Sequence, residues 1–373
     1  MRGETVIAGI GHTAYGKLPG RDTLTMNVEA CRDALADAGI AKDEVDAVFV
    51  KYPTSRFEGM YGQKVAEALG LQPAIGGVWD QGGATNISMI SFAAMAIAVG
   101  QIEVALITSA DNPRTGSRQA YERPWGEYSR YGWFGTPGAY AMIARRHMEE
   151  YGTTEDQLGA VAVACRANGA RNPDAHLQAA IGLSDHRDSP LVVEPLRRDD
   201  CCLVSDGAAA VVVTSAKRAR EAGADAAPIL GFGAGQTSWE VPQRPSLTET
   251  GAKQSAAKAF SMAGLKPQQV DVAQLYDCFT IVPIITLEDY GFCEKGEGGA
   301  FVEGGRIELN GELPVNTSGG LLSETGMPGM QLVLEGVRQI RGTSTSQAPR
   351  AGVCVVSNQG GVMHTHSTLI VGG

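Results

Sequence analysis

Ala38-Gly39-Ile40 followed by Val45-Asp46 is the stretch that decides the fold, because the chain repeats it 225 residues later as Ala263-Gly264-Leu265 followed by Val270-Asp271. Each copy has the pattern of a helix that ends at a glycine, a polar turn and a buried strand. A repeat at one fixed offset indicates two similar halves.

We place the two halves at residues 1–225 and 226–373. In both halves, short β-branched runs alternate with alanine-rich segments of helical spacing. Six of these runs are mostly apolar, which is typical of strands buried on both faces: 5–10, 45–50, 103–109, 208–214, 270–276 and 352–356. Residues 112–200 are rich in Arg, Tyr and Trp and have weaker strand signals, so we interpret them as an insertion into the first half. The sequence therefore predicts a layered α/β protein of two βαβ halves with an inserted loop domain.

Composition argues against several classes of protein. The 373 residues carry 31 Lys+Arg and 41 Asp+Glu, a formal net charge of -10, which argues against nucleic acid as a partner. The longest apolar stretch, Met89–Val99, is shorter than the ~20 residues that cross a bilayer. No signal-peptide pattern precedes the first strand run, so we expect a cytoplasmic protein without a membrane span. Seven irregularly spaced cysteines are typical of reduced thiols.

A Gly-Gly pair opens a helix in each half, at Gly82-Gly83 and at Gly319-Gly320. The first pair precedes the apolar run Met89–Val99, which we expect to be a helix buried on every side. Backbone N–H groups and the positive end of a helix dipole at such a turn would favour a developing oxyanion or a thioester carbonyl. The alternative interpretation is that the paired glycines only permit a tight turn.

Two further segments carry titratable side chains. In Tyr276-Asp277-Cys278, an extended backbone would place Tyr276 and Cys278 on one face and Asp277 on the other. From these residues alone, a core tyrosine and an inert buried thiol are the simpler interpretation. His364 and His366 have the same spacing and could share a metal, but no further ligand is near them in the sequence. We therefore predict no metal in this chain and interpret either histidine as an acid/base candidate.

Several motifs together resemble the thiolase superfamily, specifically its sterol-carrier-protein-type thiolases and lipid-transfer-protein-like relatives. The motifs are the duplicated halves, the elbow at Gly83, Val204–Ala210, Tyr276–Phe279, Val315–Ser323 and Asn358–Gly361. The resemblance covers nearly the whole chain. It implies a thiolase-like fold, in which the two halves form a layered α-β-α-β-α core.

The chain departs from this family at three of four expected catalytic positions. Gly83 stands where the family's nucleophilic cysteine becomes acylated, Gly326 where a histidine activates that cysteine, and Ser357 where a second cysteine is expected. Tyr276-Asp-Cys-Phe279 resembles the family's His-Asp-Cys-Phe motif, with Tyr in place of His. Some relatives without the nucleophile are retro-aldolases, which cleave a β-hydroxyacyl-CoA from steroid side chains into a ketone and a shorter acyl-CoA. Those relatives carry a second tyrosine at about the Gly326 position, which this chain lacks.

The resemblance thus implies an enzyme that makes or breaks a carbon–carbon bond beside a CoA thioester, foremost by retro-aldol cleavage without a covalent cysteine intermediate. Tyr276 would be the base, and Cys278 or His366 would be the acid. The candidate substrate-binding residues are Gly83, Gly320, Gly361 and His364. One alternative is a thiolase-type acyltransferase that thiolyses a β-ketoacyl-CoA with Cys278 as nucleophile. The other is a non-catalytic acyl-CoA-binding subunit of a thiolase complex.

The resemblance also implies an assembly. Lipid-transfer-like relatives with a His-rich final strand, as in His364-Thr-His366, tend to work with a small partner that has an OB-type fold and a zinc ribbon. That partner completes the acyl-CoA site. We therefore expect a homodimer flanked by two such subunits, a heterotetramer, with the CoA thioester as substrate.

Overall fold

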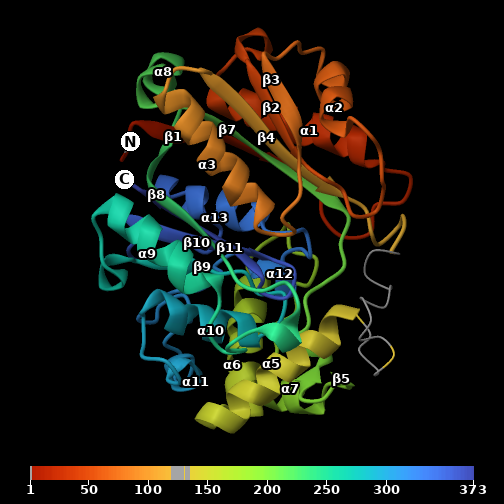
Figure 1. The fold of residues 1–373 in the computed structure, drawn as a ribbon, viewed down its shortest axis with the longest axis vertical. Helices are drawn as coiled ribbons and strands as arrows, with labels where there is room; N and C mark the ends of the chain where they lie inside the picture. The colour runs from red at the N-terminus through yellow and green to blue at the C-terminus, as the bar shows by residue number, and fades with distance from the viewer. Residues whose placement is uncertain (1, 119–129, 131–134) are drawn as a thin grey trace.

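The computed structural model describes residues 2–118, 130 and 135–373 (Figure 1). The strands of the first half are β1 (Thr5–His12), β2 (Ala47–Lys51), β3 (Ile75–Trp79), β4 (Val104–Asp111) and β7 (Gly207–Ser215). Those of the second half are β8 (Ala227–Gln236), β9 (Val272–Gln274), β10 (Val353–Gly360) and β11 (Thr365–Gly372). They form one sheet in the order β3-β2-β4-β7-β1-β8-β11-β10-β9. β2 is parallel to β3 and β4, β9 is parallel to β10, and the other neighbours are antiparallel.

Helices cover both faces of this sheet. Those of the first half are α1 (Thr23–Ala38), α2 (Tyr61–Leu69), α3 (Thr85–Ala98) and α8 (Ala216–Ala222). Those of the second half are α9 (Gly251–Ala263), α10 (Ile281–Tyr290), α11 (Gly298–Phe301), α12 (Gly320–Ser323) and α13 (Met330–Arg341). The insertion contributes α5 (Gly135–Tyr151), α6 (Glu155–Gly169), α7 (Leu183–Asp188) and the short strands β5 (Leu191–Val193) and β6 (Leu196–Arg197). Part of the predicted insertion, residues 119–129 and 131–134, lies outside the described residues.

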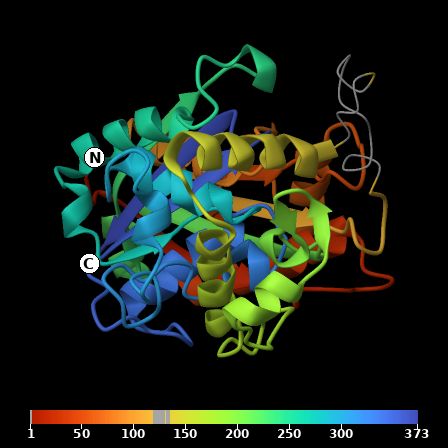
Figure 2. The ribbon, with the colours of Figure 1, turned by 90° about the horizontal axis from the view of Figure 1, so that it is seen from below.

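Successive residues of the first-half strands alternate between two apolar layers. Val48 and Val50 of β2 belong to the cluster that contains the buried faces of α1 and α2, whereas Ala47 and Phe49 belong to the cluster that contains α3. α3 and α13 lie between the first-half and second-half strands, and α9 covers the far side of β8 and β11 (Figures 1 and 2). The predicted α-β-α-β-α layering is therefore confirmed.

The sequence repeat is visible as a repeated structure. Gly39 and Gly264 end α1 and α9 in the left-handed conformation, with φ of 62° and 63°. A 3-10 turn and then a strand follow each glycine, Lys42–Glu44 before β2 and Pro267–Gln269 before β9. A short polar turn thus sends the chain back into the sheet in both halves.

Two expectations about individual elements need correction. α3 is not buried on every side, because Met95 is 44% exposed and lines a cavity of about 900 Å³, while Val99 at the helix end is 73% exposed. β9 ends at Gln274 rather than at residue 276, because Leu275 N–H donates to Asn316 Oδ1 (2.7 Å) instead of a neighbouring strand. No helix in the described part of the chain is long and apolar enough to cross a membrane.

A buried ion-pair network joins the insertion to the second half. His147 on α5 lies with Nε2 3.1 Å from both carboxylate oxygens of Glu288 on α10, and with Nδ1 2.7 Å from Thr153 Oγ1. Lys295 lies 3.0 Å from the same Glu288 carboxylate. Both side chains of the central pair are fully buried, so the network fixes α5 against α10.

Candidate active site

The Gly82-Gly83 elbow lies between β3 and α3 and rests on the end of β10. Gly82 has a φ of 59°, a left-handed conformation that glycine adopts without strain. Thr85 Oγ1 donates to Gly82 O (2.6 Å) and accepts from Gln81 N–H (2.7 Å), which closes the elbow. A Cβ added at Gly360 would lie 1.8 Å from Gln81 O, so the absence of a side chain there lets the two halves meet at this point.

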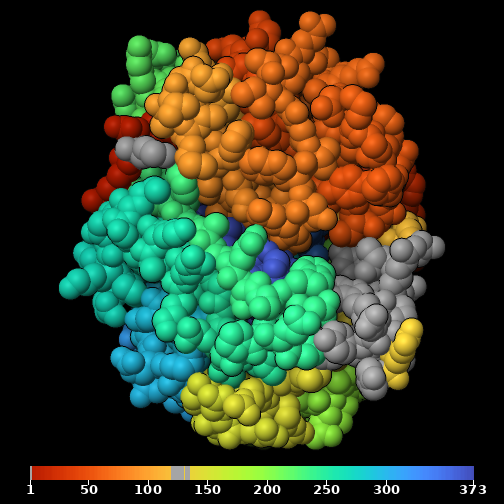
Figure 3. Space-filling model, in the orientation of Figure 1, coloured from red at the N-terminus to blue at the C-terminus, as the bar shows by residue number. Residues whose placement is uncertain are grey.

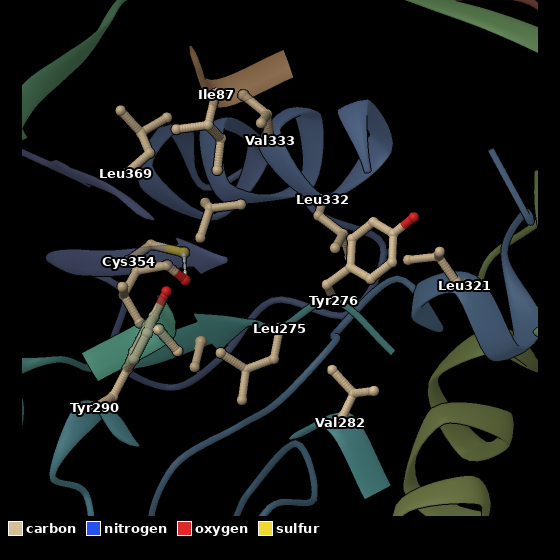
Figure 4. Packing of buried hydrophobic residues seen from close by; sticks show 14 of the residues in the cluster. Ile87, Leu275, Tyr276, Val282, Tyr290, Leu321, Leu332, Val333, Cys354 and Leu369 are labelled. Carbon is tan, nitrogen blue, oxygen red and sulfur yellow. Dashed lines mark hydrogen bonds between the residues drawn. The ribbon is translucent and has the colours of Figure 1, made fainter. Parts of the chain in front are cut away.

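Tyr276 occupies the space that a side chain at position 83 would need. A Cβ added at Gly83 would lie 2.5 Å from both Tyr276 Oη and Tyr276 Cε2, and 2.4 Å from Gln359 O. The tyrosine ring lies between Leu332 of α13 and Leu321 of α12, and its oxygen points away from the surrounding apolar cluster (Figure 4). The side chain is 7% exposed. The structure therefore brings the two predicted residues Gly83 and Tyr276 directly together.

Asp277 is fully buried. Its carboxylate accepts from Leu321 N–H (2.7 Å) and Leu322 N–H (3.2 Å) and lies 3.5 Å from the Cys165 thiol. Burial raises the pKa of Asp277 to about 6. A Cβ at Gly320 would lie 2.2 Å from Asp277 Oδ2, so the structure places Gly320 against this carboxylate rather than beside Gly83.

Cys278 is linked to the elbow support by hydrogen bonds. Gln359 Nε2 donates to Cys278 Sγ (3.1 Å) and to Tyr140 Oη (2.5 Å), and Tyr140 Oη donates to Gly361 O (3.1 Å). Burial, with the nearby Cys202 thiol adding to it, raises the pKa of Cys278 well above its usual range. Tyr140 and Gln359 are not among the residues predicted from the sequence. Gln359 lies within a quoted motif, whereas Tyr140 comes from the insertion, where no motif marks it.

The two histidines occupy different surroundings. His366 is fully buried, with Nε2 3.2 Å from Ser357 Oγ and 3.3 Å from Tyr290 Oη. None of these hydrogen bonds joins it to Tyr276 or Cys278, and burial lowers its pKa to about 3.

His364 is half-buried beside Gly361. Its ring lies edge-on to Trp239, with the ring centroids 5.2 Å apart. A Cβ added at Gly361 would lie 3.1 Å from His364 Cβ and 3.2 Å from the Trp239 ring. Gly361 and His364 are therefore neighbours.

Gly326 stands where the family carries its activating histidine, and the surrounding backbone leaves no space for a side chain there. A Cβ at Gly326 would lie 1.8 Å from Leu203 O, and Gly326 N–H donates to Ser205 Oγ (3.1 Å). The backbone therefore has no room for a side chain at this position. In the described part of the chain, no group of three His, Cys, Asp or Glu side chains could hold a metal ion.

The site therefore combines the phenol of Tyr276 and the protonated thiol of Cys278 with an elbow that has no nucleophilic side chain. This arrangement suits proton transfer to and from a substrate and does not suit acylation at the elbow.

The chain is also similar in sequence to known proteins. Residues 233–373 match the family described as thiolase C-terminal domain-like. The chain is 38% identical to 17-hydroxy-3-oxo-4-pregnene-20-carboxyl-CoA lyase of Mycobacterium tuberculosis over 100% of both chains. It is 36% identical to a steroid side-chain-cleaving aldolase of Thermomonospora curvata over 93% of both chains.

Solved structures show the same similarity. The Ltp2-ChsH2(DUF35) aldolase superimposes with a TM-score of 0.89 and 35% identity, covering 100% of this chain and 98% of that one. A monomeric SCP2-thiolase-like protein from Mycobacterium smegmatis, at 19% identity and a TM-score of 0.78 over 99% of this chain and 77% of that one, shares the fold. The predicted thiolase-like fold is therefore confirmed.

Proposed function

The chain belongs to the thiolase superfamily, in the sterol-carrier-protein-type branch that includes the steroid side-chain-cleaving aldolases, and on that premise we propose that it is a retro-aldolase acting on a β-hydroxyacyl-CoA. The reaction breaks the carbon–carbon bond beside the CoA thioester and needs no covalent cysteine intermediate. One observation carries the proposal: Tyr276 Oη fills the place of a side chain at Gly83. A proton-transfer group thus stands where a nucleophile would be.

Tyr276 acts as the base, in its phenolate form. The β-hydroxyl proton passes to the phenolate oxygen, the bond between the α- and β-carbons breaks, and its electron pair forms a thioester enolate. The β-carbon becomes a ketone. Backbone N–H groups near Gly83 and Gly361, with the positive end of α3, hold the enolate oxygen. A proton delivered to the α-carbon then releases the shorter acyl-CoA.

Cys278 is the better supported donor of that proton. Its raised pKa keeps the thiol protonated, which suits an acid and makes a poor nucleophile, so acyl transfer through Cys278 has less support. His366 has a lowered pKa and hydrogen bonds only to Ser357 and Tyr290 in the described part of the chain. It would act as an acid only after a rearrangement of that network.

A steroid CoA thioester is the substrate class that the relatives support. The Mycobacterium tuberculosis relative is named for 17-hydroxy-3-oxo-4-pregnene-20-carboxyl-CoA, whose hydroxyl lies β to the thioester carbonyl. In this chain, Gly320 and His364 would contribute to the substrate site only indirectly, through Asp277 and through Gly361. The reaction would take place in the cytoplasm.

The assembly that we propose is a homodimer with two small partner subunits. β3 lies at the edge of the sheet, and beside it the apolar side chains of Trp79, Phe92 and Met95 line the cavity of about 900 Å³. Figure 3 shows the surface hollowed between α3 and the β8–α9 region. A second copy would cover this edge and this apolar face. The solved structure of a relative named Ltp2-ChsH2(DUF35) aldolase supports a partner subunit. We propose that this subunit has the small OB-type fold and zinc ribbon.

The decisive experiment is an assay of 17-hydroxy-3-oxo-4-pregnene-20-carboxyl-CoA and a panel of β-hydroxyacyl-CoA and β-ketoacyl-CoA thioesters, with and without free CoA. We expect a 17-ketone and a shorter acyl-CoA to form without free CoA. Thiolysis of a β-ketoacyl-CoA that requires free CoA would instead establish an acyltransferase. The assay is run with the chain alone and with a co-expressed partner, while light scattering measures the mass of the complex.

A further inference from the structure

Three side chains behind the elbow form a hydrogen-bonded chain that the retro-aldol scheme does not yet use. Tyr140 from the insertion, Gln359 from β10 and Cys278 are each almost completely buried, and Cys278, at 8% exposure, is the most accessible of the three. Gln359 is also the residue whose carbonyl lies against Gly83. These hydrogen bonds therefore join the insertion to Cys278, and Gln359 also contacts the elbow.

The direction of each hydrogen bond is fixed by the backbone. Met363 N–H donates to Gln359 Oε1 (2.9 Å), so the oxygen of this amide faces Met363 and its nitrogen faces the other way. Both hydrogens of that nitrogen are donated, one to Tyr140 Oη and one to Cys278 Sγ. Tyr140 Oη, which already accepts from Gln359, donates its own proton to Gly361 O.

This polarity has a consequence for Cys278. An amide nitrogen cannot accept a hydrogen bond, so the S–H proton of Cys278 cannot go to Gln359. Tyr140 Oη also interacts with this thiol, but it already accepts from Gln359. The side of the sulfur away from both residues is therefore the side left for the S–H proton.

We propose that Tyr140 and Gln359 are positioning residues that turn the S–H proton of Cys278 toward the substrate. The inference rests on the proposed function, since it assumes that Cys278 delivers the proton to the α-carbon. Tyr140 supplies the acceptor that orients the Gln359 amide, and the same hydroxyl holds the Gly361 carbonyl. The two residues thus set the geometry of both the acid and the backbone beside the elbow.

Tyr140 is well placed for this role because its ring cannot move freely. The ring stacks on Phe279, with centroids 4.4 Å apart and planes inclined by 26°. The residue next to Cys278 in sequence therefore packs on the residue that orients Cys278. Two turns further along α5, His147 anchors the helix through its buried contact with Glu288.

Two variants and a matched control test the proposal. Tyr140→Phe keeps the stacked ring but removes the hydroxyl, and we expect kcat to fall about 10- to 100-fold with KM changed less than about 3-fold. Tyr151→Phe removes a hydroxyl from the same helix, where it contacts Glu150 at the surface, and should leave kcat and KM near wild type. Equal kcat values in these two variants would overturn the proposal.

Gln359→Glu reverses the polarity, because the carboxylate still accepts from Met363 N–H but now also accepts from the Cys278 thiol. The readout is the S–H stretching band in infrared difference spectra, assigned with Cys278→Ser and measured without substrate. We expect the band to move to lower frequency in Gln359→Glu, because the thiol becomes a stronger hydrogen-bond donor. An unmoved band would refute the assigned direction. A moved band in a protein that shows no retro-aldol turnover would support this hydrogen-bond polarity and refute the proposed function.

Discussion

Gly83→Ala tests the central geometric claim, that Tyr276 works because position 83 has no side chain. The added Cβ would lie 2.5 Å from Tyr276 Oη, whereas ordinary contact begins at 3.4 Å, so the ring must withdraw by about 0.9 Å. The other close neighbour, Gln359 O, belongs to the paired strand β10 and cannot yield as easily. Tyr276 is therefore the neighbour that yields, and the elbow backbone must also shift to clear Gln359 O.

The size of the effect follows from this displacement. A base must lie about 2.6–3.2 Å from the proton-bearing atom that it serves. A shift of about 0.9 Å takes Tyr276 Oη out of this range, and misplacement on this scale costs about 10²-fold in rate. We expect kcat for retro-aldol cleavage to fall by about this factor. The overpacking itself should cost ~1–3 kcal/mol of stability.

The assay compares four proteins: wild type, Gly83→Ala, Tyr276→Phe and the double variant. If Gly83→Ala acts through Tyr276, the alanine should cost little further rate once the phenol is absent. Gly59→Ala is the control, because a Cβ at Gly59 would meet nothing within 4 Å. Wild-type kcat in Gly83→Ala, or an equal loss with and without the Tyr276 hydroxyl, would refute the reasoning.

Three further predictions follow from the same site. Tyr276→Phe should lower kcat by about 10²- to 10⁴-fold with an unchanged circular dichroism spectrum, and wild-type rates would make this tyrosine a core residue only. Intact-mass analysis after mixing with acyl-CoA should show no acyl adduct during turnover, since Gly83 has nothing to acylate; an adduct on Cys278 would favour acyl transfer. His366, whose pKa is lowered to about 3 from 6.5, is neutral when folded but takes up a proton on unfolding below its ordinary value. The free energy of unfolding should therefore fall as the pH drops from about 6.5 towards 3. Denaturant titrations at several pH values should show that His366→Gln takes up fewer protons on unfolding, by up to one. An identical pH dependence in the two proteins would contradict this.

Much of the framework could be predicted from the sequence because local rules determine it. Glycine is the residue type that most often ends a helix, so Gly39 and Gly264 mark the two helix ends. The fixed offset between them indicates the duplicated halves. Tyr276 and Gly83 could be singled out because each departs from a family pattern. Their direct contact could not be predicted, because it depends on how α3 and α13 pack between the halves.

The remaining parts of the site depend on contacts between distant segments. Tyr140 and Gln359 are 219 residues apart, and no spacing in the sequence links them. The predicted end of β9 is wrong for a similar reason, since the Asn316 side chain, 41 residues away from Leu275, binds the backbone groups that would extend the strand. Exposure of Met95 depends on a cavity that the apolar composition of α3 does not reveal.

The buried pair of His147 and Glu288 limits how a substrate can enter. If α5 moved away from α10, the contacts of His147 with Glu288 would break, while Glu288 would keep Lys295 and the Gly298 N–H as partners. We therefore expect a CoA thioester to reach Tyr276 by a route that leaves α5 in contact with α10, since opening along α5 would separate buried polar partners.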